Sequence, residues 1–473
     1  MIRVATLIPL VLLLVQCSQP PKYDLVIANG RVMDPESGLD AIRNVGIQGE
    51  TIAEISEQEL SGAEVLDAAG HVVAPGFIDL HQHGHSPDNY KAQIHDGITS
   101  ALELEIGVAD IAAWYGEREG KTPVNFGASI SHPYSRNLVM LGSDPGLTGD
   151  ALTQPLSAQQ LDELKLRIAR GLELGAPAVG FGLAYSPGAT TEEVVEIFRV
   201  AAAHDANCHV HMRNSEPPGF ANIEEVLSAA KQTGAPLHIV HINSSSAERI
   251  PQYLEIIASA QKQGADVTTE CYPYNRGSTL LESHLFNDWR TYSDEQIAGF
   301  IWVETGETLT RETFEKYRER GGTIITPADY SEQKVQTAVA SPLTMIASDG
   351  MWLDKGRAHP RSFGTFSRIL GRYVREQKAL TLMDALRKMS LAPAQRLERR
   401  APMMAKKGRL SIGADADIVV FNPDTVIDKA TFENPVQYSE GIQHVLVNGR
   451  VTLKDGDLVE AAAAGKAIKA PSG

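Results

Sequence analysis

The chain has 473 residues, of which 43% are hydrophobic and 22% are charged, and this composition is typical of folded globular proteins rather than disordered chains. The formal net charge is −16 at pH 7 and no long run of lysine or arginine is present, so no nucleic-acid partner is expected. Three cysteines are too few for a disulfide framework to hold a fold of this length.

Residues 1–17 have the pattern of an export signal. Arg3 precedes the apolar run Leu7–Val15, which is too short to span a bilayer. Cys17 resembles the lipid-modified cysteine of bacterial lipoproteins, although Gln16 stands where a small residue is usual. We therefore expect a bacterial protein that is exported to the periplasm or anchored to the outer membrane by a lipid on Cys17. Cleavage without lipid is the alternative, and no other membrane contact is expected.

Both ends of the remaining chain have the alternating apolar pattern of short antiparallel strands. The first such region is residues 22–73, and the second is residues 401–465. Asn29–Val32 (Asn-Gly-Arg-Val) and Asn448–Val451 have the same four residues, and Asn-Gly is a frequent turn between strands. We expect the two regions to pair into one small β-sandwich that brackets a central domain.

Residues 74–400 alternate between segments typical of strands and segments typical of helices. Strands are expected at Gly76–His83, Ile98–Ile106, Val124–Ile130, Ala178–Ala184, His209–Met212, Leu237–Ile242, Asp266–Tyr272 and Thr344–Ser348. Helices are expected at Ala158–Leu174, Glu192–Ala203, Ile223–Thr233 and Pro251–Gln263. Gly175, Gly234 and Gly264 follow three of these helices, in a position where glycine commonly ends a helix.

Eight strands with helical connections predict an α/β fold, a (β/α)8 TIM barrel whose active site forms at the C-terminal ends of the strands. An open, doubly wound sheet is the alternative, but it usually has a glycine-rich phosphate loop after its first strand, and none is present. Residues 283–341 separate the last two strands and exceed the length of an ordinary connection. This insertion is expected to be a lid over the barrel mouth or a surface excursion.

Side chains that can bind metals recur at the expected strand ends. They are His81 and His83, Glu103 and Glu105, His209 and His211, His238 and His241, and Asp349. His81 and His83 lie two residues apart, so on a strand both imidazoles project from the same face. A barrel brings its strand ends together, and imidazole and carboxylate groups suit divalent metals such as Zn²⁺. The sequence therefore predicts a metal site.

Several short phrases resemble those of the amidohydrolase superfamily, and within it the N-acyl-D-amino-acid deacylase (D-aminoacylase) family. They are Ala74–His83 (Ala-Pro-Gly-Phe-Ile-Asp-Leu-His-Gln-His), Gly97–Ser100 (Gly-Ile-Thr-Ser), His211–Arg213 (His-Met-Arg), Tyr272–Tyr274 (Tyr-Pro-Tyr), Ser348–Gly350 (Ser-Asp-Gly), His359–Arg361 (His-Pro-Arg), Ala392–Leu397 (Ala-Pro-Ala-Gln-Arg-Leu) and Gly413–Phe421. Together they extend in order over the chain from about Tyr23 to Val451, which makes the resemblance more specific than any single motif.

The resemblance implies a metal site of one or two ions, most simply Zn²⁺, surrounded by His81, His83, His211, His241 and Asp349. The family has a metal-binding cysteine after the second strand, and this chain has none there. Glu105 is the expected replacement, with Glu103 as the alternative. Asn243 stands where the family has a lysine. Tyr272 and Arg361 match positions that resemble the family's contacts to the substrate carboxylate, and His359 is expected beside the mouth.

The expected activity is hydrolysis of a linear amide in a small molecule with a free carboxylate, most simply an N-acyl-D-amino acid. In this hypothesis Glu105, His211 and His241 hold a metal that activates water, and Asp349 transfers the proton. The rival readings are a dipeptidase or carboxypeptidase-like enzyme, a hydantoinase or dihydroorotase-like opener of cyclic amides, and a non-catalytic lipoprotein. Cyclic-amide relatives typically bridge their metals with a carboxylated lysine, and no lysine lies at an expected strand end.

Overall fold

The structure, a computed structural model, describes residues 22–214, 219–459 and 463–471. The expected export signal and Cys17 lie outside the described residues, so export and lipidation stay predictions. Lipid modification of Cys17 and cleavage without lipid would give mature N-termini of different mass, which mass spectrometry can measure. Within the described residues, no helix combines the length and apolarity needed to cross a bilayer.

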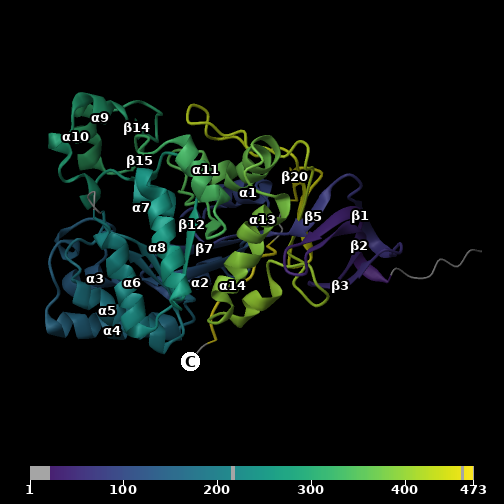
Figure 1. Ribbon diagram of the computed structural model, residues 1–473, viewed down its shortest axis with the longest axis horizontal. Coiled ribbons are helices and arrows are strands. Elements are labelled where there is room, and N and C mark those ends of the chain that lie inside the picture. The colour runs from purple at the N-terminus through teal and green to yellow at the C-terminus, as the bar shows by residue number, and fades with distance from the viewer. Residues whose placement is uncertain (1–21, 215–218, 460–462, 472–473) are drawn as a thin grey trace, which may run out of the picture.

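A parallel eight-stranded barrel forms the centre of the molecule (Figure 1). Its strands, in chain order, are β6 (Phe77–Asp79), β7 (Ile98–Val108), β8 (Asn125–Ser131), β9 (Ala178–Gly182), β10 (Asn207–His211), β11 (Leu237–Ile239), β12 (Val267–Cys271) and β16 (Thr344–Ile346). Each pairs with the next along the chain. A bridge between Gln82 and Gly350 joins the segments that follow the first and last strands, so the barrel is nearly closed. This confirms the predicted fold.

Helices cover the outside of the barrel. They are α1 (Pro87–His95), α2 (Ile111–Arg118), α3 (His132–Leu141), α4 (Ala158–Glu173), α5 (Thr191–Ala203), α6 (Ala221–Thr233), α7 (Ile242–Ser246), α8 (Ile250–Lys262), α11 (Glu332–Ala340), α12 (Arg361–Arg368), α13 (Leu382–Leu386) and α14 (Ala392–Glu398). The four helices predicted from sequence are confirmed within two residues. Gly175, Gly234 and Gly264 all have positive φ, as a helix-ending glycine requires.

The two ends of the chain pair as predicted and form one continuous nine-stranded sheet. Its strands are β1 (Tyr23–Asp34), β2 (Leu39–Gln48), β3 (Thr51–Ser56), β4 (Gly62–Asp67), β5 (Val72–Pro75), β17 (Ile418–Phe421), β18 (Ile442–Val447), β19 (Arg450–Lys454) and β20 (Asp457–Leu458). β5 and β17 are antiparallel neighbours and join the two halves. Alternate residues serve two cores: Ile418 and Val420 pack within the small domain, whereas Val419 and Phe421 join the main core.

A separate unit is inserted between β12 and β16 and stands beside the barrel mouth, at the upper left of Figure 1. It contains β13 (Ser278–Leu280), α9 (Asp294–Ala298), β14 (Ile301–Trp302), α10 (Arg311–Arg320) and β15 (Thr323–Ile325). An aromatic core including Trp302 and Phe314 holds it together. The unit begins before the expected residue 283 and ends before α11, which packs against the barrel helix α8.

The last described residues return to the barrel and complete its wall. β8 and β9 pair only near the end of β8, at Ile130 and Ser131. Before that point residues 466–468 lie beside β8: the Phe126 N–H donates to the Lys466 carbonyl (3.0 Å), and the Ile468 N–H donates to the Phe126 carbonyl (2.7 Å). The Ile468 side chain is fully buried. This tail therefore belongs to the barrel rather than to the small sheet.

Replacing Ile468 by alanine should lower the free energy of unfolding by about 2–5 kcal/mol, because it removes a fully buried aliphatic group from close-packed surroundings. Urea denaturation would measure the change. Leu166→Ala is the control, since Leu166 is 73% exposed on α4 and its loss should matter little. Equal unfolding midpoints for the two variants would contradict the role of the tail.

Candidate metal centre

Histidine and carboxylate side chains from five strand ends meet at the C-terminal end of the barrel. His81 and His83 follow β6, Glu105 lies in β7, His211 ends β10, His241 follows β11, and Asp349 follows β16. This is the end at which barrel enzymes place their active sites. The structure thus brings together all six side chains that were predicted from sequence as metal ligands.

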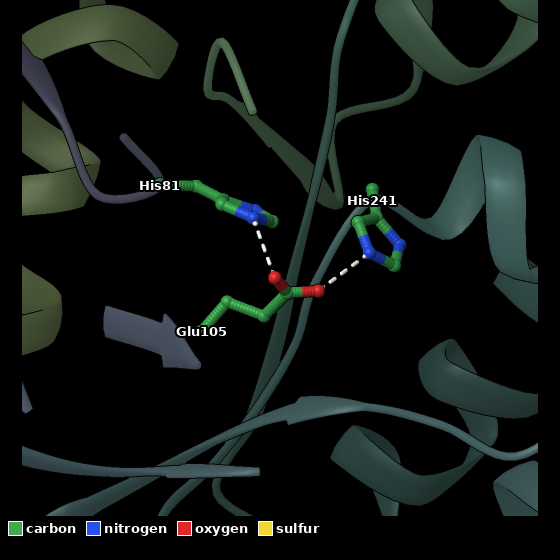
Figure 2. Close-up of side chains that lie close together, drawn as sticks. All are labelled: His81, Glu105 and His241. Carbon is green, nitrogen blue, oxygen red and sulfur yellow. Dashed lines mark hydrogen bonds and ion pairs between the residues drawn. The ribbon is translucent and has the colours of Figure 1, made fainter. Parts of the chain in front are cut away.

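The Glu105 carboxylate lies at the centre of the cluster, and Figure 2 shows it between His81 and His241. Its Oε1 atom is 2.7 Å from His211 Nδ1 and 2.9 Å from His241 Nε2. Its Oε2 atom is 3.2 Å from the Nε2 atoms of both His81 and His83. One carboxylate therefore contacts four imidazoles, two through each oxygen.

Glu103, the alternative carboxylate, occupies a different place. Its Oε2 atom lies 2.6 Å from His83 Nδ1, on the side of the ring away from Glu105, and its Oε1 atom accepts from the Gly107 N–H. Glu103 thus contacts the cluster through one histidine, whereas Glu105 contacts four. This geometry favours Glu105 as the ligand.

The nitrogen and oxygen atoms of these side chains lie close enough together for one ion to contact several of them. His81 Nε2 and His83 Nε2 are 3.2 Å apart, and His211 Nδ1 and His241 Nε2 are 3.1 Å apart. Two groups have ligand atoms that all lie within 4.8 Å of one another: His81, Glu105 and His241, and His81, His83 and Asp349. Buried imidazoles and carboxylates in sets of this kind suit a divalent ion such as Zn²⁺.

A second layer of polar side chains orients these imidazoles. Glu270, in β12, lies 2.6 Å from His81 Nδ1 and 3.0 Å from His238 Nε2. Ser245 Oγ lies 3.1 Å from His241 Nδ1. Such contacts leave the opposite nitrogen, Nε2, facing the centre, as outer-layer carboxylates and hydroxyls do around metal-binding histidines. Sequence reasoning missed Glu270, although it precedes Cys271 and Tyr272 at an expected strand end.

The cluster is buried and its charges depend on one another. Burial disfavours the charged form of His81, but Asp349, Glu105 and Glu270 raise its pKa well above the ordinary value. Burial likewise disfavours the ionised form of Glu105, but His81, His211 and His241 lower its pKa well below the ordinary value. The carboxylates therefore attract positive charge, which protons or a metal ion can supply.

Of the two histidine pairs at the fifth and sixth strands, only His211 and His241 reach the centre. His209 and His238 are fully buried inside the barrel, with ring centroids 4.6 Å apart, and do not reach the centre. His241 was expected within a strand, but β11 ends at Ile239. His241 has left-handed backbone (φ 31°) at the start of α7, and this turn directs its ring toward Glu105.

Asp349 is held in a strained position between the cluster and Arg361. Its backbone is left-handed (φ 51°), which is unfavourable for a non-glycine residue and often marks a functional site. Its Oδ1 atom is 2.8 Å from Arg361 Nη2 and 3.4 Å from His81 Nε2. The preceding residue, Ser348, donates its N–H to Asp79 in β6. Burial favours the neutral acid, but Arg361 and His81 lower the pKa of Asp349.

A cavity of about 560 Å³ opens over the centre and is lined by five of the six predicted metal ligands, all but His81, together with Tyr272 and Arg361. The Arg361 guanidinium lies over the Tyr272 ring, with its Cζ atom 4.6 Å from the ring centroid. These two predicted substrate contacts therefore face the same space as the centre.

His359 is not a lining residue, contrary to the sequence prediction. It is fully buried: its Nδ1 atom accepts from the Arg361 N–H, and its Nε2 atom lies 3.1 Å from the Arg276 carbonyl oxygen. His359 therefore supports the backbone of Arg361. Asn243, where the family has a lysine, is also structural, because its side-chain amide donates to the Tyr272 carbonyl oxygen and to the Tyr330 hydroxyl.

Residues 64–453 match the model of a family described as "Amidohydrolase family". An N-acyl-D-glutamate deacylase from Alcaligenes xylosoxydans xylosoxydans is 34% identical, over 90% of this chain and 93% of that protein. A D-aminoacylase from the same organism is 31% identical, over 91% and 94% respectively. The crystal structure of N-acyl-D-glutamate deacylase from Bordetella bronchiseptica, complexed with zinc and a phosphonate inhibitor, matches with a TM-score of 0.82 at 27% identity, covering 95% of this chain and 100% of that one. These matches confirm the resemblance found in the motifs, and the chain belongs to the amidohydrolase family.

Proposed function

We propose that this protein is a metal-dependent deacylase that hydrolyses the amide bond of N-acyl-D-amino acids. The observation that carries the proposal is the position of Arg361, whose guanidinium shares a cavity with the predicted metal ligands. The relatives named above support the same substrate class, since they are called N-acyl-D-glutamate deacylase and D-aminoacylase. A dipeptidase or carboxypeptidase-like activity would use the same groups, because its substrate also has an amide beside a carboxylate.

Arg361 has unused donors suited to a substrate carboxylate. It is 1% exposed, and its Nη2 group binds Asp349 and the Ser278 carbonyl oxygen. Its Nε and Nη1 groups have no partner among the described residues. Leaving donors of a buried guanidinium unpaired is costly, and a carboxylate is the acceptor that matches its planar geometry. The amino-acid part of the substrate would supply that carboxylate.

The donor set fits one or two divalent ions, most simply Zn²⁺, the metal in the Bordetella bronchiseptica structure. Glu105, His211 and His241 would hold one ion. His81, His83 and Asp349 would hold a second ion, or would orient the substrate. A divalent ion in such a site polarises the amide carbonyl and activates water for attack.

Asp349 is placed to move the proton that amide hydrolysis requires. Its lowered pKa indicates an ionised carboxylate, and because Asp349 lines the cavity this carboxylate can accept a proton from the attacking water. The departing nitrogen needs a proton to leave as an amine, and the same carboxyl group can return it. Arg361 contacts Asp349 directly and so orients both this carboxylate and the carboxylate of the substrate.

Opening of a cyclic amide is the weaker candidate. Relatives that open cyclic amides typically bridge two metals with a carboxylated lysine. Among the described residues that line the cavity there is no lysine, and Glu105 occupies the centre. The linear amide is therefore the better match.

Removing the metal should abolish hydrolysis, and restoring it should recover the activity. We expect protein dialysed against a chelator to lose at least about 100-fold in kcat/KM for its best N-acetyl-D-amino acid, and added Zn²⁺ to restore it. The panel should also contain N-acetyl-L-amino acids, dipeptides ending in a D-residue, and dihydroorotate. Full activity of metal-free protein, or turnover of dihydroorotate alone, would refute the proposal.

Asp349→Asn should lower kcat by about 10²- to 10⁴-fold, because the amide side chain cannot accept the proton. Elemental analysis should still find metal in the variant, since four histidines and Glu105 remain. Asp88→Asn, which alters an exposed carboxylate of α1, is the control and should leave kcat unchanged. Wild-type turnover by the Asp349 variant would remove this residue from the mechanism.

Glu270→Gln should weaken metal binding by about 10- to 100-fold, because Glu270 orients His81 without touching the cavity. Competition with a chromophoric chelator would measure the affinity of the metal-free protein. Glu193→Gln is a matched control: Glu193 is also a buried carboxylate beside a histidine, 2.7 Å from His132, but it lies outside the centre. Equal losses of affinity in the two variants would show that the effect is not local.

A further inference from the structure

One wall of the cavity over the metal centre is apolar. Its side chains form one hydrophobic cluster, and all of them line the cavity: Ile106, Tyr134, Leu147, Tyr185, Leu280 and Leu285. They come from β7, α3 and the loop after it, the loop after β9, and the inserted unit. The Tyr185 hydroxyl is bonded to Thr279 Oγ1 at 2.8 Å, so the phenol group is already partnered. This wall offers contact area but no counter-charge.

The cationic side chains of the cavity are already engaged. Apart from the histidines, Arg213 and Arg361 are the only cationic residues among the described lining residues. Arg213 Nε lies 2.9 Å from Glu225 Oε2, and Arg213 also donates to the Ser186 carbonyl oxygen. Arg361 binds Asp349 and, in the proposed function, the substrate's α-carboxylate. No further cation is left in this lining for a second carboxylate.

The remaining charges of the lining repel an acidic group. Glu295 and Asp329, both exposed at the rim, line the cavity and are negative. Arg276 is not a lining residue, and it donates to the carbonyl oxygens of Thr326 and Gly299. A second carboxylate entering the cavity would therefore lose water and meet apolar or like-charged groups.

We infer that the substrate of this site has a single carboxylate and an uncharged, apolar side chain, of the leucine or methionine type. The inference rests on the proposed function and narrows its substrate class. It also separates this chain from its 34% identical relative, whose name specifies N-acyl-D-glutamate. The apolar wall supplies the favourable contact, and the lack of a free cation supplies the discrimination.

The test compares substrates that differ in one property at a time. N-acetyl-D-glutamine and N-acetyl-D-glutamate have nearly the same shape and differ in charge, whereas N-acetyl-D-leucine adds the apolar character. We expect kcat/KM to be highest for N-acetyl-D-leucine, lower for N-acetyl-D-glutamine and lowest for N-acetyl-D-glutamate. The value for N-acetyl-D-glutamate should be about 100-fold below that for N-acetyl-D-leucine. A glutamate value equal to or above those of glutamine and leucine would overturn the inference and leave the proposed function intact. Failure to cleave any N-acyl amino acid would instead refute the proposed function, and the inference with it.

A charge placed on the wall should reverse part of this preference. Leu285, half-buried in a short helical turn (His284–Phe286), can be replaced by the longer arginine. Leu285→Arg should raise the glutamate-to-leucine ratio of kcat/KM by at least about tenfold, since it supplies the missing counter-charge. Leu285→Ala separates the effect of charge from that of lost contact: it should lower kcat/KM for N-acetyl-D-leucine without raising kcat/KM for N-acetyl-D-glutamate, whereas Leu285→Arg should raise the latter.

Leu166→Arg is the matched control, because it adds the same charge on the exposed face of α4, outside the lining. Its glutamate-to-leucine ratio should equal that of the wild type. A ratio that rises equally in Leu166→Arg and Leu285→Arg would show a general effect of net charge and would overturn the assignment of the wall. So would a Leu285→Arg protein with normal folding by circular dichroism and an unchanged ratio.

Discussion

The contact between the Glu105 carboxylate and four imidazoles is the interaction on which this structure depends. A carboxylate buried this deeply is unfavourable unless opposite charge or hydrogen-bond donors surround it. Oε1 faces the histidines from β10 and β11, and Oε2 faces the pair that follows β6. No single segment of chain could supply these partners. The barrel can, because it places the ends of strands that are distant in sequence around one opening.

The surrounding scaffold keeps those partners in place. Ser348 bonds to Asp79, which ties the segment carrying Asp349 to the first strand of the barrel. Glu270 holds the far side of the His81 ring, and the His359 ring accepts a hydrogen bond from the backbone of Arg361. The left-handed backbone of Asp349 is tolerated because the contacts of Ser348 and Arg361 fix the segment on one side and the side chain on the other. Rigid positioning of this kind is what hydrolysis needs, since small displacements of reacting groups slow the chemical step.

Much of this arrangement could be predicted from the chain because it follows from short-range periodicity. Strand alternation and helix-ending glycines located the eight strands, and the spacing of two between His81 and His83 placed both rings on one side. Features set by long-range contacts could not be predicted. His241 looks like a strand residue until the left-handed turn after Ile239 is known. Glu270 resembles any strand carboxylate until His81, distant in sequence, is seen beside it. The pairing of residues 466–468 with β8 has no local signal either.

The proposed replacement of the family's cysteine by Glu105 would change more than one ligand. A thiolate offers a single sulfur atom, whereas this carboxylate divides its two oxygens between two pairs of histidines. Each oxygen faces a different pair of imidazoles, so Glu105 would contribute to both halves of the centre when metal is bound. The second departure, Asn243, fits the same view. A lysine there would bring positive charge close to the centre, whereas the amide holds the backbone of Tyr272. In the proposed function, the positive charge for the substrate comes from Arg361, which the inserted unit and Asp349 hold at the cavity. Under the proposed substrate preference, the site selects its substrate through the absence of a second free cation as well as through Arg361 and the apolar wall.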